Sequence, residues 1–286
     1  MSPTSVEDLE CALAGESYLA DRGLAVALFL ALSMERPLLL EGEPGVGKTE
    51  VARTLARIQG AELIRLQCYE GIDASQALYE WNYARQLLQA RTLDRADGEH
   101  GLDELYREEF LVERPLLAAL RRGSGAVLLI DEVDRADDEF EAFLLEVLAD
   151  FSVTVPEIGT ITAESRPTVV LTSNRTRELH DALKRRCLYH WIDYPDVDRE
   201  TEIVKLRVPG VSESLARSIA EATARLRELD LIKPPGPAES IDWAASVSAL
   251  AAERLDPKVA GATLGAVIKN RDDLKVAVQA LPEVLA

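Results

Sequence analysis

The stretch Gly42-Glu43-Pro44-Gly45-Val46-Gly47-Lys48-Thr49 decides the fold of this chain of 286 residues. It follows a short apolar run, residues 38–40, and precedes a helical pattern over residues 50–59. A strand, a glycine-rich loop and a helix in this order form a P-loop, whose backbone N–H groups and helix N-terminus favour a phosphate. Lys48 can reach the β- and γ-phosphates, and the Thr49 hydroxyl can bind Mg²⁺. The stretch therefore predicts a nucleoside triphosphate site.

A second apolar run, residues 126–130, ends in Asp131 and Glu132. A carboxylate at the end of a buried strand can hold Mg²⁺, and its neighbour can polarise an attacking water as a general base. We therefore expect Asp131 to bind Mg²⁺ and Glu132 to act in hydrolysis. The alternative is an Asp-Glu helix cap at a strand end, which the upstream P-loop makes the weaker interpretation.

Polar and basic residues follow two later segments. Asn174 comes after residues 168–172, where it can orient a water or serve as a turn residue. Arg185 and Arg186 follow a short helical pattern, residues 180–184. An adjacent arginine pair is typical of a solvated surface. Alternatively, one of the two supplies positive charge to the γ-phosphate of a neighbouring subunit.

The order of elements indicates an α/β fold. Uninterrupted apolar strands separated by helices are typical of a parallel sheet that is covered on both faces. The five candidate strands are residues 38–40, 62–68, 126–130, 168–172 and 188–194. Two stretches do not fit a minimal core: residues 71–114, rich in charged and aromatic side chains, and residues 151–166, which predict a β-hairpin. We expect a five-stranded parallel sheet with two insertions.

Strand patterns end at Pro195, and the remainder of the chain has helical patterns only. We expect an α/β nucleotide-binding domain over residues 1–195 and a small all-helical lid domain over residues 196–286. The helices predicted for the second domain are residues 199–207, 212–229, 240–254 and 258–279.

Composition and charge narrow the classes of function. The chain has 32 Lys+Arg against 50 Asp+Glu and a formal net charge of −18, which repels nucleic acid phosphates and anionic lipid. Its three cysteines are far apart and not in CxxC spacing, which fits a reducing compartment. The longest apolar stretch, residues 24–34, is too short to cross a bilayer. We expect a cytoplasmic protein with no integral membrane segment and no nucleic-acid partner.

The aromatic residues of the first insertion allow two interpretations. Tyr79, Trp81 and Tyr83 either pack the insertion onto the body of the protein or form a surface that grips another protein. The sequence favours neither. The three histidines have no ligand-like spacing, so we expect no metal site besides the one for Mg²⁺.

Together these motifs resemble those of AAA+ ATPases, and within them the MoxR family. The resemblance extends over essentially the whole chain and rests on residues 36–49, Leu128-Leu-Ile-Asp-Glu-Val-Asp-Arg135 and Leu171-Thr-Ser-Asn174. The two insertions match the helix-2 insert and the hairpin before sensor 1 of this family. Leu78-Tyr-Glu-Trp-Asn-Tyr83, Asp181-Ala-Leu-Lys-Arg-Arg-Cys187 and residues 264–273 are similar to the CoxD branch. That branch is associated with maturation of molybdenum-containing carbon monoxide dehydrogenase.

The resemblance implies a role for each motif. Walker A binds ATP through Pro44, Gly45, Val46, Gly47, Lys48 and Thr49; Walker B is Asp131 and Glu132; sensor 1 is Asn174. Arg186 resembles the arginine finger that acts in trans, with Arg185 as the near alternative. A finger in trans implies a homo-oligomer, and the family expectation is a hexameric ring. The implied partners are a protein with a von Willebrand factor A domain and a metalloenzyme client.

The chain departs from the family at one motif. Members often carry a sensor 2 arginine at the start of a lid helix, but the matching stretch, residues 237–243, has Asp242 at that place. No sensor 2 residue is assigned.

The favoured function is an ATP-driven machine that remodels a client protein. One alternative is a nucleic-acid-directed motor, against which the net charge of −18 counts. The other is a nucleotide switch or adaptor that does not hydrolyse ATP, which would need neither Glu132 nor Asn174.

Overall fold

The computed structural model describes residues 3–91 and 104–286 of the chain. Contacts within it define two compact units. The first contains Gly23–Glu41 and Ala52–His190 with the residues up to Val6, and the second contains Glu7–Arg22, Gly42–Val51 and Trp191–Ala286. Each unit has a hydrophobic core of its own. The division into domains 1–195 and 196–286 stays a prediction.

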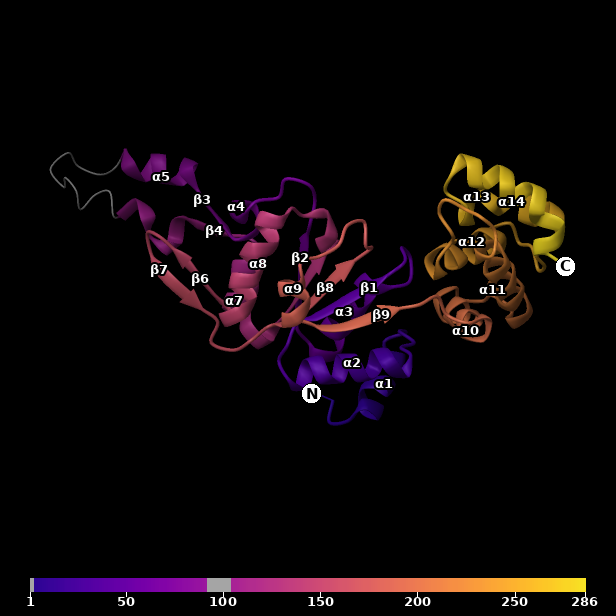
Figure 1. Cartoon of the computed structure of the whole chain (residues 1–286), viewed down its shortest axis with the longest axis horizontal. Helices are drawn as coiled ribbons and strands as arrows, with labels where there is room; N and C mark the ends of the chain where they lie inside the picture. The colour runs from indigo at the N-terminus through magenta and orange to yellow at the C-terminus, as the bar shows by residue number, and fades with distance from the viewer. Residues whose placement is uncertain (1–2, 92–103) are drawn as a thin grey trace. The chain divides into compact units, whose positions relative to one another are not determined.

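A five-stranded sheet with the strand order β2-β5-β8-β1-β9 forms the centre of the first unit (Figure 1). Its strands are β1 (Leu38–Gly42), β2 (Glu62–Gln67), β5 (Ala126–Asp131), β8 (Thr168–Ser173) and β9 (Leu188–Ile192). β5 pairs in parallel with β2 and β8, and β8 pairs in parallel with β1. Every residue of β1 and β5 is buried, as expected for central strands of a covered parallel sheet. The predicted α/β fold is confirmed.

Helices of the first unit pack against this sheet. Outside the insertions, these helices are α2 (Arg22–Ser33), α3 (Lys48–Gln59), α7 (Pro115–Arg122), α8 (Asp138–Asp150) and α9 (Asp181–Arg186). α7 contacts β2 and β5, and α8 contacts α9. α1 (Val6–Gly15) lies before α2 in the chain and belongs almost entirely to the second unit.

Both insertions contain a pair of antiparallel strands. The first holds α4 (Ala74–Ala77), β3 (Tyr79–Trp81), α5 (Tyr83–Ala90), the short 3-10 helices η1 (Glu104–Tyr106) and η2 (Glu108–Phe110), and β4 (Leu111–Glu113). The second is the predicted hairpin of β6 (Ser152–Val155) and β7 (Gly159–Thr162). A further 3-10 helix, η3 (Gly123–Gly125), precedes β5.

The aromatic residues of the first insertion differ in burial. Trp81 is buried, with its ring centroid 6.0 Å from that of Tyr79 and 5.4 Å from that of Tyr106, both edge-on. Such edge-to-face pairs stabilise a packed core. Tyr83, by contrast, is 62% exposed. Trp81 is therefore a packing residue, and Tyr83 belongs to the surface.

Five helices gather around a second core in the C-terminal part of the second unit (Figure 1). They are α10 (Val197–Arg207), α11 (Glu213–Arg227), α12 (Pro237–Ala249), α13 (Pro257–Val267) and α14 (Arg271–Val284). A fully buried Glu200 carboxylate accepts two hydrogen bonds of 2.7 Å from the Arg227 guanidinium. Because an unpaired buried charge is costly, this pair fixes α10 against α11.

The prediction of a single helix over residues 258–279 is wrong, because residues 268–270 are not helical and separate α13 from α14. Ile268 is extended, and the Asn270 side chain accepts hydrogen bonds from the backbone N–H groups of Asp272 and Asp273. An asparagine N-cap followed by acidic residues in the first turn starts a new helix. Among the described residues, no helix has the length and apolar character needed to cross a membrane.

Candidate active site

The P-loop connects β1 to α3 and belongs to the second compact unit. Gly45 and Gly47 have φ angles of +81° and +96°, which residues with side chains rarely adopt. A Cβ on Gly45 would also lie 2.7 Å from the Glu239 carboxylate. The loop conformation therefore requires glycine at both positions.

The Lys48 side chain is hydrogen-bonded to the backbone of this loop. Its Nζ donates hydrogen bonds of 2.7 Å to the Gly42 carbonyl and 2.8 Å to the Glu43 carbonyl, and the residue is 7% exposed. α3 begins at Lys48, so Thr49 lies in the first turn of the helix. Helix N–H groups, a lysine and a hydroxyl thus gather at one end of the loop, a donor set that fits a phosphate and its Mg²⁺.

The start of α12 contacts the P-loop within the same unit. The N–H of Ala238 donates to the Gly45 carbonyl at 3.2 Å, and a Cβ on Gly236 would lie 2.7 Å from the Pro44 carbonyl oxygen. Asp242, which occupies the expected sensor 2 position, pairs with Lys269 at 3.7 Å. This helix therefore touches the loop through its backbone.

Asp131 ends β5 with a buried and anchored carboxylate in the first unit. Its Oδ1 accepts from the Thr172 hydroxyl at 2.5 Å, and its Oδ2 accepts from Arg65 Nε at 3.0 Å and Nη2 at 2.6 Å. Mg²⁺ prefers carboxylate oxygens as ligands, so the Asp131 carboxylate fits this role. To bind the metal through Oδ2, it must first release its charge-assisted pair with Arg65.

Glu132 follows in the left-handed conformation, with φ of 55°. Its N–H donates to the Thr172 hydroxyl at 2.9 Å. Its carboxylate, 31% exposed, accepts from Gln67 Nε2 at 3.1 Å and pairs with Arg135 at 3.0 Å, at the end of the 3-10 helix η4 (Val133–Arg135). Because of this backbone conformation, the two neighbouring carboxylates lie in different surroundings. That of Asp131 is buried, and that of Glu132 is partly open to solvent.

Asn174 lies directly after β8, the neighbour of β5 in the sheet. The buried Asp134 carboxylate accepts from the N–H groups of Asn174 at 3.2 Å and Thr176 at 2.8 Å, and from the Thr176 hydroxyl at 2.7 Å. Because parallel strands end at one edge of the sheet, Asp131, Glu132 and Asn174 lie together there. Lys48 and Thr49 belong to the other compact unit.

Arg185 and Arg186 end α9 and are both exposed. The Arg185 carbonyl accepts from Arg36 at 2.9 Å, which fixes the backbone at the helix end. Within the described part of the chain, neither guanidinium pairs with a carboxylate.

Sequence reasoning missed four residues that surround the carboxylates: Arg65, Gln67, Asp134 and Thr172. Arg65 and Gln67 share one face of β2, and Gln67 lies opposite Asp131 in the register of β2 and β5. Polar residues at alternate positions of an otherwise apolar strand were the available signal. The residues around Arg65 and Gln67 do not indicate that β2 pairs with β5.

The chain is similar in sequence to proteins of staphylococci. An uncharacterized protein of Staphylococcus epidermidis (strain ATCC 12228) is 27% identical over 212 residues, which cover 72% of each chain. One of Staphylococcus aureus (strain USA300) is 28% identical over 189 residues, 63% of each chain.

A solved structure of a RuvB mutant from Thermotoga maritima has a TM-score of 0.51 at 17% identity, covering 98% of this chain and 77% of that one. At that identity the likeness concerns the fold alone. The family described as AAA domain (dynein-related subfamily) matches residues 37–187, which include the P-loop, both carboxylates, Asn174 and both arginines. The chain therefore belongs to the dynein-related subfamily of AAA domains.

Proposed function

We propose that this protein is an AAA+ ATPase of the MoxR type that hydrolyses ATP to remodel a client protein. The observation that carries the proposal is the pair of adjacent carboxylates after β5, in which Asp131 is anchored and Glu132 is partly open to solvent. A protein that only binds nucleotide needs a metal ligand but no second carboxylate for a water. The pair therefore supports hydrolysis over a nucleotide switch.

In the proposed reaction, Lys48 and the loop backbone bind the phosphates of ATP, while Thr49 and Asp131 hold Mg²⁺. Glu132 accepts the proton of the attacking water at its carboxylate as the water oxygen bonds to the γ-phosphorus, and Asn174 orients that water. The bond from the γ-phosphorus to the β–γ bridging oxygen breaks in the same step, so ADP leaves with that oxygen and inorganic phosphate is released. Mg²⁺, when bound, offsets negative charge on the phosphate oxygens.

Either Arg186 or Arg185 supplies the remaining positive charge to the site of a neighbouring subunit. Their exposure at the end of α9 supports this role, because a finger in trans must leave its own chain. The proposal therefore includes a homo-oligomeric ring, six-membered by family resemblance, in which every site is shared between two protomers.

The helical region, residues 196–286, acts as a lid whose movement follows the state of the nucleotide. The contact of Ala238 with Gly45 supports this coupling, since it joins the lid helix α12 to the loop that binds phosphate. By resemblance to the CoxD branch, the client is a metalloenzyme undergoing maturation in the cytoplasm, such as a molybdenum carbon monoxide dehydrogenase, with a von Willebrand factor A domain protein as adaptor.

The test compares steady-state ATP hydrolysis by the wild type, Lys48→Ala and Glu132→Gln. We expect Glu132→Gln to retain ATP and to lose turnover by about 10²-fold or more, because the general base is gone. Lys48→Ala should lose binding as well. Wild-type turnover no faster than that of Lys48→Ala would favour the switch, and strong stimulation by DNA would favour a nucleic-acid motor.

A further inference from the structure

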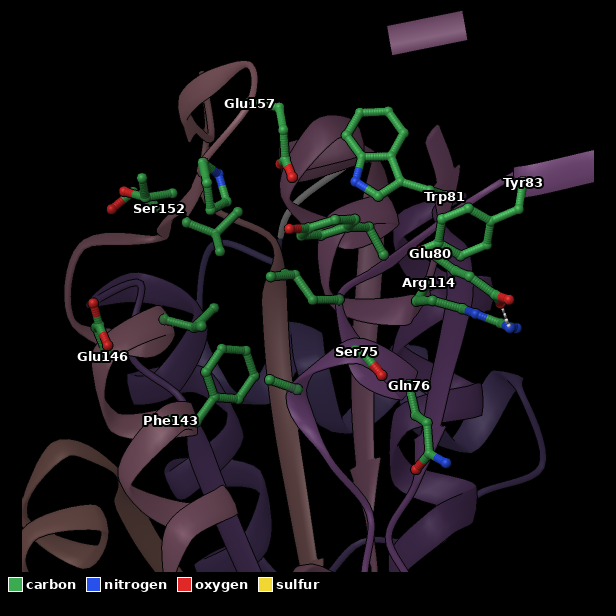
Figure 2. Close-up of a pocket in the computed structure, with 17 residues that line it drawn as sticks. Ser75, Gln76, Glu80, Trp81, Tyr83, Arg114, Phe143, Glu146, Ser152 and Glu157 are labelled. Atoms are coloured by element: carbon green, nitrogen blue, oxygen red, sulfur yellow. Dashed lines mark hydrogen bonds and ion pairs between the residues drawn. The ribbon is translucent and has the colours of Figure 1, made fainter. Parts of the chain in front are cut away.

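A groove with a volume of about 910 Å³ lies within the first compact unit, between the two insertions. Its walls come from α4 and β3 of the first insertion, from α8, and from β6 and the following turn of the hairpin (Figure 2). None of the catalytic candidates lines it. The groove is thus a feature separate from the carboxylates that follow β5.

Apolar side chains line part of the groove. Phe143 and Val147 line it from α8, and Val153 lines it from β6. Tyr83 lines it from the first insertion and is 62% exposed. Leu87, one helical turn further along α5, is 67% exposed, so the apolar surface continues beyond the groove.

The rim of the groove is acidic. Glu80, Glu146 and Glu157 line it, while the one basic lining residue, Arg114, is ion-paired with Glu80 (Figure 2). Among the described residues, Glu146 and Glu157 have no cationic partner. Burial, and the negative charge of Glu157, raise the pKa of Tyr79. Two carboxylates thus lie beside these apolar side chains without a cationic partner among the described residues.

Two of the walls are strands with an open edge. In the described part of the chain, β3 pairs with β4 alone and β6 pairs with β7 alone. A strand with one unpaired edge offers a row of N–H and C=O groups to an added strand. An extended polypeptide can add to either of these edges.

We propose that this groove binds an extended segment of another polypeptide in which apolar side chains are flanked by Lys or Arg. Apolar side chains complement the interior, and the cations complement Glu146 and Glu157 as well as the net charge of −18. An acidic segment or a nucleic acid would be repelled by the same carboxylates. The inference rests on the proposed function in that the segment belongs to the protein being remodelled.

The test is fluorescence anisotropy of a labelled peptide, Gly-Ser-Arg-Leu-Val-Arg-Phe-Ser-Gly, titrated with the full-length protein. The matched probe carries Glu in place of both Arg. The double variant Glu146→Lys/Glu157→Lys should bind the first probe roughly tenfold more weakly, and Tyr83→Ser several-fold more weakly. The control is Glu164→Lys, the same charge reversal at an exposed position beyond β7 that does not line the groove.

Equal affinity of wild type and double variant for the first probe, or equal affinity of the wild type for both probes, would overturn the proposal. So would a change in the mass of the double variant without a change in peptide binding, because the groove would then join copies of this chain. ATP hydrolysis is measured on the same samples. Absent turnover with intact peptide binding would defeat the proposed ATPase and leave the groove, whereas the reverse would defeat the groove alone.

Discussion

Arg65 determines what surrounds the Asp131 carboxylate. Its guanidinium donates twice to Oδ2 from a side chain that is 46% exposed, so it competes with any cation for that oxygen. This arrangement was not predictable from the P-loop and the Asp-Glu pair, because it depends on the pairing of β2 with β5.

We expect Arg65→Gln to lower, by several-fold, the Mg²⁺ concentration needed for tight binding of a fluorescent ATP analogue. The physical reason is that the substitution removes a unit charge that competes for Asp131. Without Mg²⁺ the variant should be less stable by about 1–3 kcal/mol, since a buried carboxylate loses its partner. Arg254→Gln removes the same charge from an exposed position and should change neither quantity. A higher Mg²⁺ requirement would show that Arg65 assists the metal rather than opposing it.

Burial raises the pKa of two of the three cysteines. Burial, reinforced by the negative charge of Asp131, raises the pKa of Cys68 to about 12, and burial raises the pKa of Cys187 to about 12 against the opposing charge of Arg36. Cys11 is exposed. At about pH 8 iodoacetamide should modify Cys11 alone in the folded protein, because the thiolate is the reactive form.

The same two thiols make stability depend on pH. Unfolded thiols titrate near pH 8.5, so below about that pH their stabilising contribution is complete. It decreases as the pH rises toward the folded value of about 12, because only the unfolded chain then loses its protons. Mass spectrometry after labelling and unfolding midpoints from pH 8 to 11 test this. Rapid modification of Cys68 in folded protein would contradict it.

At the scale of elements, the approach of α12 to the P-loop depends on one glycine. Gly236 has an ordinary φ of −92°, but a Cβ there would lie 2.7 Å from the Pro44 carbonyl oxygen and 3.0 Å from the Gly45 carbonyl carbon. Backbone atoms yield less readily than side-chain ends, so the start of α12 must move away.

We therefore expect Gly236→Ala to cost about 1–3 kcal/mol of stability and to weaken ATP binding. Gly265→Ala is the matched control, because it lies within α13 with nothing within 4 Å of an added Cβ. That change should stabilise the protein by about 0.5–1 kcal/mol, since alanine favours a helix. Thermal unfolding and nucleotide titration separate the two. Unchanged affinity in Gly236→Ala would show that the helix and the loop are not coupled.

Elements specified by local patterns were predictable from the sequence, and those specified by pairing were not. The P-loop and the buried strand before Asp131 follow from glycine spacing and a continuous apolar run. The hairpin β6–β7 follows from alternation around a turn. The break before Asn270 had a local signal, an N-cap followed by two aspartates, which the surrounding helical pattern concealed. The arrangement of Arg65 and Gln67 around the carboxylates needed the strand order.

At the scale of the whole molecule, charge opposes assembly. Each copy has a formal net charge of −18, so a ring brings together like-charged subunits, and salt should favour assembly by screening them. What favours the ring, in our proposal, is the pairing of an exposed arginine with a nucleotide in the neighbouring subunit. Nucleotide that is bound but not hydrolysed should then shift the balance toward the oligomer.

Light scattering of Glu132→Gln, with and without ATP and Mg²⁺, measures that balance. We expect a shift to about six subunits when nucleotide is present, because the variant retains ATP and the arginine contacts persist. Arg186→Ala should still bind nucleotide as a single subunit but lose about 10³-fold or more in turnover. Arg185→Ala is the matched control, since both residues are exposed at the end of α9. A larger loss from Arg185→Ala would exchange their roles, and a single subunit under both conditions would remove the finger in trans altogether.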